Sequence, residues 1–451
     1  MQILIVGGGT VGFELAVQLQ RAGHDVALVE KDPQRCAEIE EKLDILVVAG
    51  QGSSPRALER AGIAGAQMAI AVTSVDEVNI LVCGMATQYG VETRIARIRS
   101  GEFLSRSSHV DLSALGVTRV IDPEHVMTRI IEQIALIPEA VEVFSYHDGQ
   151  VLIARHIMKE GMPILGKALS DILPQDSSHQ FLAVALRRDG TDCIPAGDDV
   201  PRPGDDFTTI FPREALPKYL EMLGLGGHSV RKAVVAGNGR TAVHLCEHFS
   251  RWVDDVVLVD RDAEHGRKAA EILDDVDVIH GDPTEQDVLR EVNTGKADLF
   301  VGAGRETSRN VMSALLAKSE GARRVIAISF EPKSNRLFRD IGVDHVVSPR
   351  RAMAQEIMDV IHRGRLSVEL QLRDMNLESL EIKAGRNSKI TRAPLHKVWQ
   401  PFKRQAIAGA VFRGGHTLIP QGNTVIEPGD DVIVVTQPKV LSRIHSLFRE
   451  R

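Results

Sequence analysis

Two short segments of this chain, 230 residues apart, each join a β-forming run to a glycine-rich turn and a helical pattern. In the first, residues 3–6 precede Gly7-Gly8-Gly9-Thr10-Val11-Gly12, which fits the pattern G-x-G-x-x-G. In the second, residues 232–236 precede Gly237-Asn238-Gly239-Arg240-Thr241-Ala242, where alanine replaces the third glycine. A strand, turn and helix of this kind begin a Rossmann-type fold, in which the helix N-terminus faces a pyrophosphate. We therefore predict two nucleotide-binding α/β units.

An acidic residue follows each turn at the same distance. Glu30 ends the predicted strand 26–29, eighteen residues after Gly12, and Asp260 ends the strand 256–259, eighteen residues after Ala242. A carboxylate there accepts hydrogen bonds from an adenosine ribose and disfavours a 2′-phosphate. The pattern therefore favours NAD over NADP. The alternative is a tight turn that binds no ligand.

The repeat extends over the whole chain. Beyond the two turns, Asn79 corresponds to Asn310, and the loop 203–206 (Pro-Gly-Asp-Asp) corresponds to 428–431. The spacings of these pairs, 230, 231 and 225 residues, stay nearly constant along the chain, which indicates an internal duplication. We predict four domains: residues 1–124 and 230–350 as doubly wound parallel-sheet Rossmann domains, and residues 139–222 and 366–451 as small α+β domains. The repeated Pro-Gly-Asp-Asp loops could shape a ligand site or only a hairpin, and the hairpin is favoured.

Composition narrows the function. The formal net charge of −7 argues against a nucleic-acid partner, since such proteins usually carry a basic face. No stretch offers 18 consecutive apolar residues, and no signal segment precedes the first strand, so we expect a cytoplasmic protein. The four cysteines are scattered without a CxxC pair, so neither a disulfide framework nor a zinc site is expected.

Further ligand positions follow from the fold, because ligands bind beyond the carboxyl ends of parallel strands. Gly50 follows the third predicted strand, and Thr73 and Ser74 follow the fourth. Arg97 lies in the fifth strand of a sheet that is otherwise strongly apolar, and a buried guanidinium there needs an anion such as a phosphate. The alternative is that Arg97 pairs with Glu77 or Glu102.

The second unit differs at these positions. Gly281 and Asp282 follow its third strand, and Ile328 stands where Arg97 does. We therefore expect the second pocket to bind more weakly, or to bind a different nucleotide.

Catalytic residues are not repeated. A dehydrogenase needs an acid or base aimed at the nicotinamide. The chain shows no Ser–Tyr–Lys set and no His–carboxylate pair that recurs in both halves. The glycine turn is repeated, whereas no set of catalytic residues is. We therefore expect a nucleotide sensor without catalytic residues. The rivals are an NAD-dependent oxidoreductase and a nucleotide-sensing regulator of some other process.

In these features the sequence resembles the RCK (KTN) family of gating proteins for potassium transporters and channels, in the tandem arrangement of Trk-type uptake systems. The resemblance covers nearly the whole chain. It rests on the order RCK-N, RCK-C, RCK-N, RCK-C, on Gly7–Gly12 with Glu30, on Ala96-Arg97-Ile98, on Gly237-Asn238-Gly239 with Asp260, and on the two Pro-Gly-Asp-Asp loops.

The resemblance implies a homo-oligomeric, tetrameric ring on the inner face of the membrane, beneath a Trk-type potassium transporter subunit. It implies NAD(H) as the ligand, with ATP or ADP as alternatives. The first pocket would use Gly7 to Val11 near the phosphates, Glu30 on the ribose, Thr73 and Ser74 beside the nucleotide, and Arg97 near the phosphates. The second would use Gly237, Asn238, Gly239, Arg240 and Asp260.

The chain departs from the commoner family pattern after the third strand of each half. Many members have Gly-Asp-Ala/Gly-Thr there, whereas this chain has Gly50-Gln51-Gly52-Ser53 and Gly281-Asp282-Pro283. The helices predicted at 124–137 and 352–362 would be shared between neighbouring units. An apolar stripe on the first, with Met127 and Ile131, is expected to be either core or a subunit contact.

Overall fold

The computed structural model describes residues 1–451 except 105–108, 173–180, 227–229, 364–367, 373–374 and 451. The described chain forms four β-sheets in two compact units that interleave along the sequence. One unit, Met1–Glu132 with Val230–Met358, holds both parallel sheets, and the other, Gln133–Ser229 with Asp359–Arg451, holds both antiparallel sheets. The duplicated halves therefore combine like with like.

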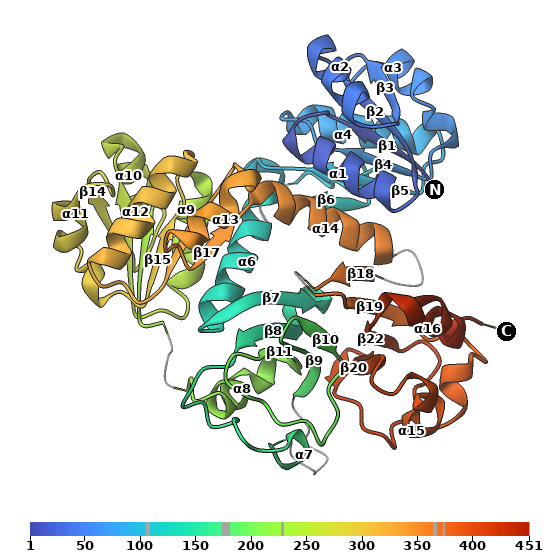
Figure 1. The fold of residues 1–451 in the computed structure, drawn as a ribbon. Helices are drawn as coiled ribbons and strands as arrows, with labels where there is room; N and C mark the ends of the chain where they lie inside the picture. Colours follow the sequence, from blue (N-terminus) through green and yellow to red (C-terminus); the bar gives the residue numbers. More distant parts are fainter. Residues whose placement is uncertain (105–108, 173–180, 227–229, 364–367, 373–374, 451) are drawn as a thin grey trace. The chain divides into compact units, whose positions relative to one another are not determined.

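The first parallel sheet has the order β3-β2-β1-β4-β5-β6, with helices on both faces (Figure 1). Its strands are β1 (Gln2–Val6), β2 (Asp25–Glu30), β3 (Leu46–Ala49), β4 (Met68–Ala71), β5 (Thr93–Arg97) and β6 (Arg119–Ile121). Its helices are α1 (Thr10–Arg21), α2 (Pro33–Lys42), α3 (Pro55–Arg60), α4 (Asp76–Gln88), α5 (Gly101–Leu104) and α6 (Pro123–Leu136).

The second parallel sheet repeats this order as β14-β13-β12-β15-β16-β17. Its strands are β12 (Lys232–Ala236), β13 (Asp255–Asp260), β14 (Asp277–His280), β15 (Leu299–Gly302), β16 (Val325–Ile328) and β17 (His345–Val347). Its helices are α9 (Arg240–Phe249), α10 (Ala263–Ala270), α11 (Gln286–Glu291), α12 (Thr307–Ser319), α13 (Asn335–Asp340) and α14 (Pro349–Arg363). The predicted pair of doubly wound sheets is confirmed.

The central strands are apolar on both faces because helices cover both sides of the sheet. Ile3 to Val6 are at most 1% exposed, and Ala233 to Ala236 at most 2%. The stripe on α6 is core at its centre, because Met127 and Ile131 are buried within one chain. An ion pair between Arg129 of α6 and Glu356 of α14 joins the two long helices that follow the parallel sheets.

The antiparallel sheets also match each other. Their orders are β10-β9-β11-β8-β7 and β21-β20-β22-β19-β18. The first contains β7 (Ala140–Tyr146), β8 (Val151–Ile157), β9 (Leu182–Arg188), β10 (Thr191–Cys193) and β11 (Asp206–Pro212), with helices α7 (Leu169–Ile172) and α8 (Leu216–Met222). The second contains β18 (Val368–Gln371), β19 (Glu378–Lys383), β20 (Ala406–Arg413), β21 (His416–Leu418) and β22 (Asp431–Thr436), with α15 (Leu395–Val398) and α16 (Leu441–Phe448). The sequence patterns did not predict β10, β21, α8 or α16.

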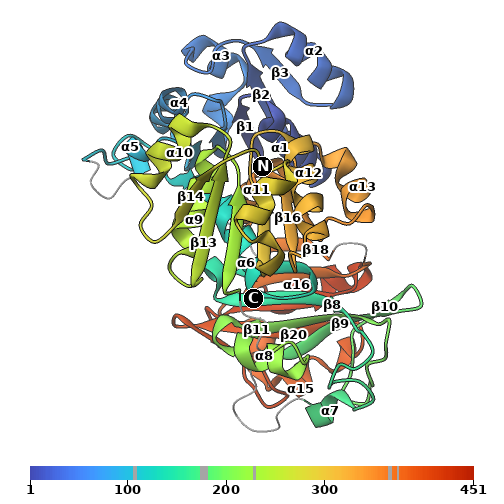
Figure 2. The ribbon, with the colours of Figure 1, turned by 90° about the vertical axis from the view of Figure 1, so that its left-hand side faces the viewer.

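These two antiparallel sheets share a hydrophobic core (Figure 2). Ile153 and Val184 of the first sheet pack with Ile433 and Val435 of the second, all of them buried. The hydroxyl of Tyr146 forms a buried hydrogen bond of 2.8 Å with that of Ser379. The fold class is thus as predicted, with the added feature that the small domains pack together as one unit.

Candidate functional sites

The carboxyl ends of the first parallel sheet bring the predicted residues to one edge. Gly7 follows β1, Glu30 ends β2, Gly50 follows β3 and Arg97 ends β5. Thr73 lies just beyond β4, which is the neighbour of β1 on the other side. The strand order reverses between β1 and β4, which is where open α/β sheets bind ligands.

Two glycines of the first turn are required by close contacts. Gly7 has a φ of +108°, and a Cβ there would lie 3.0 Å from the backbone nitrogen of Thr73. A Cβ on Gly12 would lie 1.9 Å from the carbonyl oxygen of Gly7. The tight turn and the close helix packing expected from the sequence are therefore both present.

Gly9 differs from these two glycines in having open space beside it, because a Cβ there would meet nothing within 4 Å. It is the N-cap of α1 and offers no side-chain capping bond. The N–H groups of the first helical turn, starting at Thr10 and Val11, therefore lack side-chain acceptors and point toward this open side. This geometry can receive an anion.

Glu30 is held against the turn. Its Oε2 accepts a hydrogen bond of 2.6 Å from the backbone N–H of Gly8, and its Oε1 accepts one of 3.0 Å from that of Asp32. The Nε of Arg35 donates to the carbonyl of Gly8 at 2.9 Å. Sequence reasoning missed Arg35, since nothing in the spacing of the motif marks the first turn of α2.

A buried asparagine organises the far side of the edge. The side chain of Asn79 accepts from the backbone N–H and the hydroxyl of Thr73, at 2.9 and 2.7 Å, and donates to the carbonyls of Thr73 and Arg97. It thereby joins the ends of β4 and β5. The hydroxyl of Thr73 is engaged in this support, whereas Ser74 is exposed. The sequence marks Asn79 only as a position that is repeated at Asn310, and that repetition is the signal that indicates this role.

Arg97 is the unusual charge of this edge. Its Nε is buried and has no hydrogen-bond partner among the described residues. No ion pair joins it to Glu77 or Glu102 in the described part of the chain, so the local pairing considered from the sequence is not seen. Burial, and next the charge of Arg99, lower the pKa of Arg97, while Glu124 and Asp76 act in the opposite direction. An added anion would relieve this unfavourable burial.

The second edge has the same scaffold. A Cβ on Gly237 would lie 2.6 Å from the carbonyl carbon of Ala303, so β12 also needs a glycine after it. Asn310 accepts from the backbone N–H of Gly304 at 2.7 Å and donates to the carbonyl of Ile328 at 2.8 Å, as Asn79 does at the first edge. Gly239 is the N-cap of α9, which starts with Arg240 and Thr241.

The glycines after the third strands have a shared structural reason. A Cβ on Gly50 would lie 2.7 Å from the Cβ of Ala57 in α3. A Cβ on Gly281 would lie 2.7 Å from a methyl of Val288 in α11. Both glycines therefore allow the next helix to approach the strand end, which accounts for them without a ligand.

The acidic residue of the second edge is bound elsewhere. Asp260 is fully buried, and its Oδ1 accepts from the backbone N–H of Asp262 at 2.8 Å. Its Oδ2 pairs with the Nδ1 of His265 in α10. Glu30 contacts the glycine turn, whereas both oxygens of Asp260 contact the loop and helix that follow it.

A chain of ion pairs spans the second edge. Arg261 contacts Glu306 at 3.2 Å, Glu306 contacts Arg309 at 3.2 Å, and Arg309 contacts Asp282 at 2.8 Å. Burial acts to raise the pKa of Asp282, but hydrogen bonds from Thr284 and Arg309 outweigh it and lower that pKa. The predicted ligand residue Asp282 is therefore already paired, and Asn238 carries no comparable bond to Asp260 among the described contacts.

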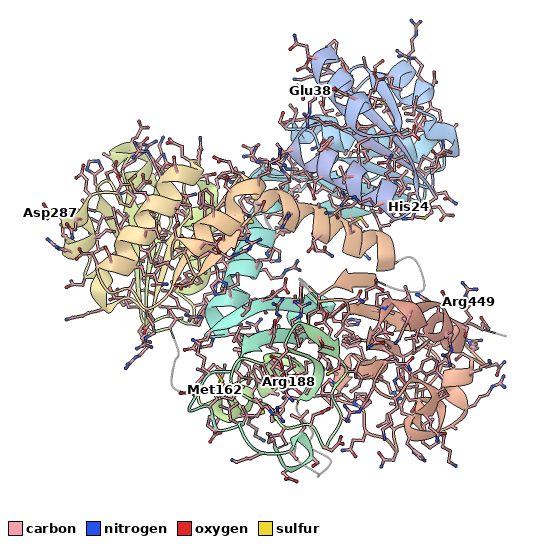
Figure 3. The ribbon with its side chains drawn as sticks, in the orientation of Figure 1. His24, Glu38, Met162, Arg188, Asp287 and Arg449 are labelled. Carbon is pink, nitrogen blue, oxygen red and sulfur yellow. The ribbon has the colours of Figure 1, made fainter. Side chains whose placement is uncertain are left out.

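The Pro-Gly-Asp-Asp loops are clamped turns. Arg188 of β9, labelled in Figure 3, donates to both carboxylate oxygens of Asp205, at 2.8 and 2.6 Å. Arg413 of β20 donates in the same way to Asp430, at 2.9 and 2.6 Å. In each copy the aspartate also caps its own loop by accepting a backbone N–H. These contacts support the hairpin interpretation.

Comparison with known proteins identifies the family. The model of the TrkA-N domain matches residues 3–123 and again 233–349, more than half of the chain, and that of the TrkA-C domain matches residues 401–449. The chain belongs to the TrkA family. The two TrkA-N matches contain the two parallel sheets with their glycine turns, Asn79 and Asn310.

Relatives of the same length support this assignment. The chain is 30% identical to the Trk system potassium uptake protein TrkA of Halomonas elongata and 29% identical to that of Azorhizobium caulinodans. Each alignment covers 100% of this chain and 99% of the relative. A TrkA homolog of Archaeoglobus fulgidus is 30% identical over all of both chains.

Solved structures share the fold. The GsuK RCK domain superimposes with a TM-score of 0.61 at 18% identity, over 99% of this chain and 95% of that one. The GsuK channel bound to NAD gives a TM-score of 0.62, over 99% of this chain and 78% of that one. Among the described helices of the present chain, none combines the length and the apolar character needed to cross a membrane.

Proposed function

We propose that this TrkA-family chain is a regulatory, nucleotide-binding subunit of a Trk-type potassium uptake transporter, gating potassium transport in response to NAD(H) or to ATP and ADP. The observation that carries the proposal is the first sheet edge, which holds an open helix N-terminus, a carboxylate and an arginine whose buried Nε has no hydrogen-bond partner among the described residues. The potassium transporter in this proposal comes from the relatives, which are named Trk system potassium uptake proteins.

At the first edge, we assign the phosphates to the turn Gly7–Gly12 and to Arg97. The open side of Gly9 gives a pyrophosphate access to the backbone, and Arg97 gains the anion that it lacks. Glu30 then accepts from the ribose, which competes with its present bond to Gly8. Ser74 is accessible to the nucleotide, while Thr73 acts mainly through its backbone.

The second edge is proposed to bind more weakly or to take another nucleotide. Residues Gly237 to Thr241 keep the turn and the helix start. However, Ile328 replaces Arg97, Asp260 is paired with His265, and Arg309 occupies Asp282. A ligand would have to break existing contacts there. The known RCK structure bound to NAD, and another GsuK structure bound to ADP, make both nucleotides suitable probes.

Gating follows from differential affinity: a nucleotide changes the assembly only as far as it binds one conformation better. We propose that the chain consists of the four domains 1–124, 139–222, 230–350 and 366–451, of which the two small ones, sharing a core, take part in this change as one unit. We further propose that several chains form a ring, tetrameric in the simplest arrangement, on the cytoplasmic face of the membrane. Because regulation requires no turnover, the proposal includes no catalytic residue.

Calorimetry of the full chain with NAD, NADH, ATP and ADP tests the nucleotide part. Micromolar binding of at least one is expected, and Gly9→Asp should weaken it about a hundredfold, since a carboxylate would face the phosphates. The fold should survive, because a side chain at Gly9 meets no neighbour. The matched variant Gly239→Asp should leave the tighter binding step unchanged. Equal losses in both variants, or none in Gly9→Asp, would contradict the assignment.

Co-purification with the membrane fraction tests the potassium part. We expect a Trk-type transporter to be recovered with the chain. Its release or retention should depend on which nucleotide is present. Nucleotide binding without any such transporter would favour the regulator unrelated to potassium. Hydride transfer to a small substrate, detected from NADH absorbance, would favour the oxidoreductase.

A further inference from the structure

Three ligand-type side chains from both halves of the chain meet at the junction of the antiparallel sheets. His147 lies in the turn between β7 and β8, Glu381 lies in β19, and Asp431 begins β22. One ligand atom from each lies within 4.8 Å of the others. The side chains are 18%, 14% and 20% exposed, so the cluster is enclosed but reachable.

We propose that His147, Glu381 and Asp431 bind a divalent transition-metal cation at this junction. This site is separate from the nucleotide edges and goes beyond the proposed function. One imidazole and two carboxylates are typical ligands of Zn²⁺, with Mn²⁺ as the next candidate. Mg²⁺ and Ca²⁺ prefer oxygen ligands only, so the imidazole argues against them.

The histidine is held in a position suited to this role. Its Nε2 lies 2.9 Å from an Oε1 of Glu381, yet this buried nitrogen makes no hydrogen bond within the described chain. The ring stacks on Phe412 of β20, with centroids 3.9 Å apart. His147 also has a φ of +49°, which non-glycine residues rarely adopt. A buried nitrogen without a hydrogen bond, beside two carboxylates, is a geometry that a cation would complete.

The matching position in the first half contains a permanent cation. Arg155 pairs with Thr208 across β8 and β11, as Glu381 pairs with Ile433 across β19 and β22. The guanidinium of Arg155 contacts the carboxylates of Asp206, at 2.7 Å, and Glu142, at 3.5 Å. In the second half Glu381 replaces this arginine, so a carboxylate faces Asp431 where the first half has a positive charge. A bound cation would restore the charge balance.

Lys383 is the competing group. Its Nζ lies 2.8 and 3.0 Å from the two carboxylate oxygens of Asp431, but its side chain is 60% exposed. Exposed ion pairs of this kind contribute little to stability. A divalent cation can therefore displace the ammonium from one carboxylate oxygen, or share the carboxylate with it.

Calorimetric titration of Zn²⁺ into the tag-free, chelator-treated full chain tests this site. One saturable site per chain is expected, with His147→Ala and Glu381→Gln each lowering the affinity at least tenfold. Glu381→Arg should abolish binding, because it installs the guanidinium that the first half has. Excess Mg²⁺ should not compete.

Two controls separate this site from other Zn²⁺ ligands. His416→Ala, at the exposed end of β21, and Cys193→Ser should retain wild-type affinity. Thermal unfolding without metal checks that each variant folds, and Zn²⁺ should raise the melting temperature of the wild type and the controls only. Saturable binding that is unchanged in His147→Ala and Glu381→Gln, or no saturable binding to the wild type, would overturn the proposal.

Discussion

The two parallel sheets of this chain share a scaffold and differ in the groups that face a ligand. Asn79 and Asn310 join the same strand ends with nearly the same hydrogen bonds. Arg97 at the first edge is replaced by Ile328, and the open space beside Gly9 contrasts with the ion pairs of Arg309 at the second edge. Duplication has therefore kept the first glycine of each turn and the asparagine that joins the strand ends, and has changed the charged groups around them.

The two antiparallel sheets also share some contacts and differ in others. The clamps of Arg188 on Asp205 and of Arg413 on Asp430 are the same in both copies, because each closes a backbone turn. Arg155 and Glu381, by contrast, occupy matching positions with opposite charges. The two copies therefore have the same residues at the clamped turns and different residues at the position of Arg155 and Glu381.

The largest effect is expected at the third position of the glycine motif. In Gly12→Ala the new Cβ would collide with the carbonyl of Gly7, so chemical denaturation should show a loss of about 3 kcal/mol, with loss of first-site binding. The reverse change, Ala242→Gly, should cost only about 1 kcal/mol, from helix propensity. Equal costs in the two halves would show that the turns pack alike.

The next effect concerns the unpaired cation. Arg97→Ile copies the second edge into the first and should lower nucleotide affinity by about 2 kcal/mol, roughly thirtyfold, because a charged hydrogen bond to the ligand is lost. The free energy of unfolding should stay the same or rise, since a buried charge without a partner disappears. Calorimetry with the best-binding nucleotide measures this, and unchanged affinity would place the phosphates elsewhere.

A smaller effect, on the free energy of unfolding at low pH, is expected from a histidine in the first antiparallel sheet that the second sheet lacks. Burial lowers the pKa of His156 to about 4, and its ring nitrogens contact the carbonyl of Pro138 and the hydroxyl of Tyr219. Below the ordinary pKa of about 6.5, the unfolded chain takes up a proton that the folded chain does not. Stability therefore falls as the pH decreases toward 4, by about 1.4 kcal/mol at pH 5.5.

The matching residue of the second half, Ile382, cannot titrate. Denaturation curves between pH 7 and pH 5 should therefore be flatter in His156→Leu than in the wild type, even if that variant is less stable throughout. His416→Leu, at an exposed position, should keep the wild-type slope. A wild-type slope in His156→Leu would assign the acid sensitivity to another group.

The smallest effect is expected at the ribose carboxylate. Glu30→Ala should weaken nucleotide binding by about 1 kcal/mol, or fivefold, because one hydrogen-bond partner is lost and its present bond to Gly8 offsets part of the gain. Asp260→Ala should leave the tighter binding step unchanged. A larger loss from Asp260→Ala would reverse the ranking of the two pockets.

Much of the fold followed from local patterns. Apolar strands and glycine turns predicted each doubly wound sheet, since these signals act over short stretches of chain, and the repeat spacing of 230 residues predicted that there are two such sheets. The short strands β10 and β21 escaped prediction, because segments such as Thr191–Cys193 have weak strand propensity and are fixed by pairing with a longer neighbour. Helix α8 escaped for the same reason, as its Tyr219 is buried by packing against the sheet.

The sequence by itself determined the duplication, the two glycine turns and the set of residues at the strand ends, because each depends on spacing along the chain. Only the tertiary structure decided which of those residues are available. It left the Nε of Arg97 without a hydrogen-bond partner among the described residues, tied Asp260 to His265, and brought His147 from one half beside Glu381 from the other. Contacts between residues more than 200 positions apart depend on how whole sheets pack, and no local pattern encodes that packing.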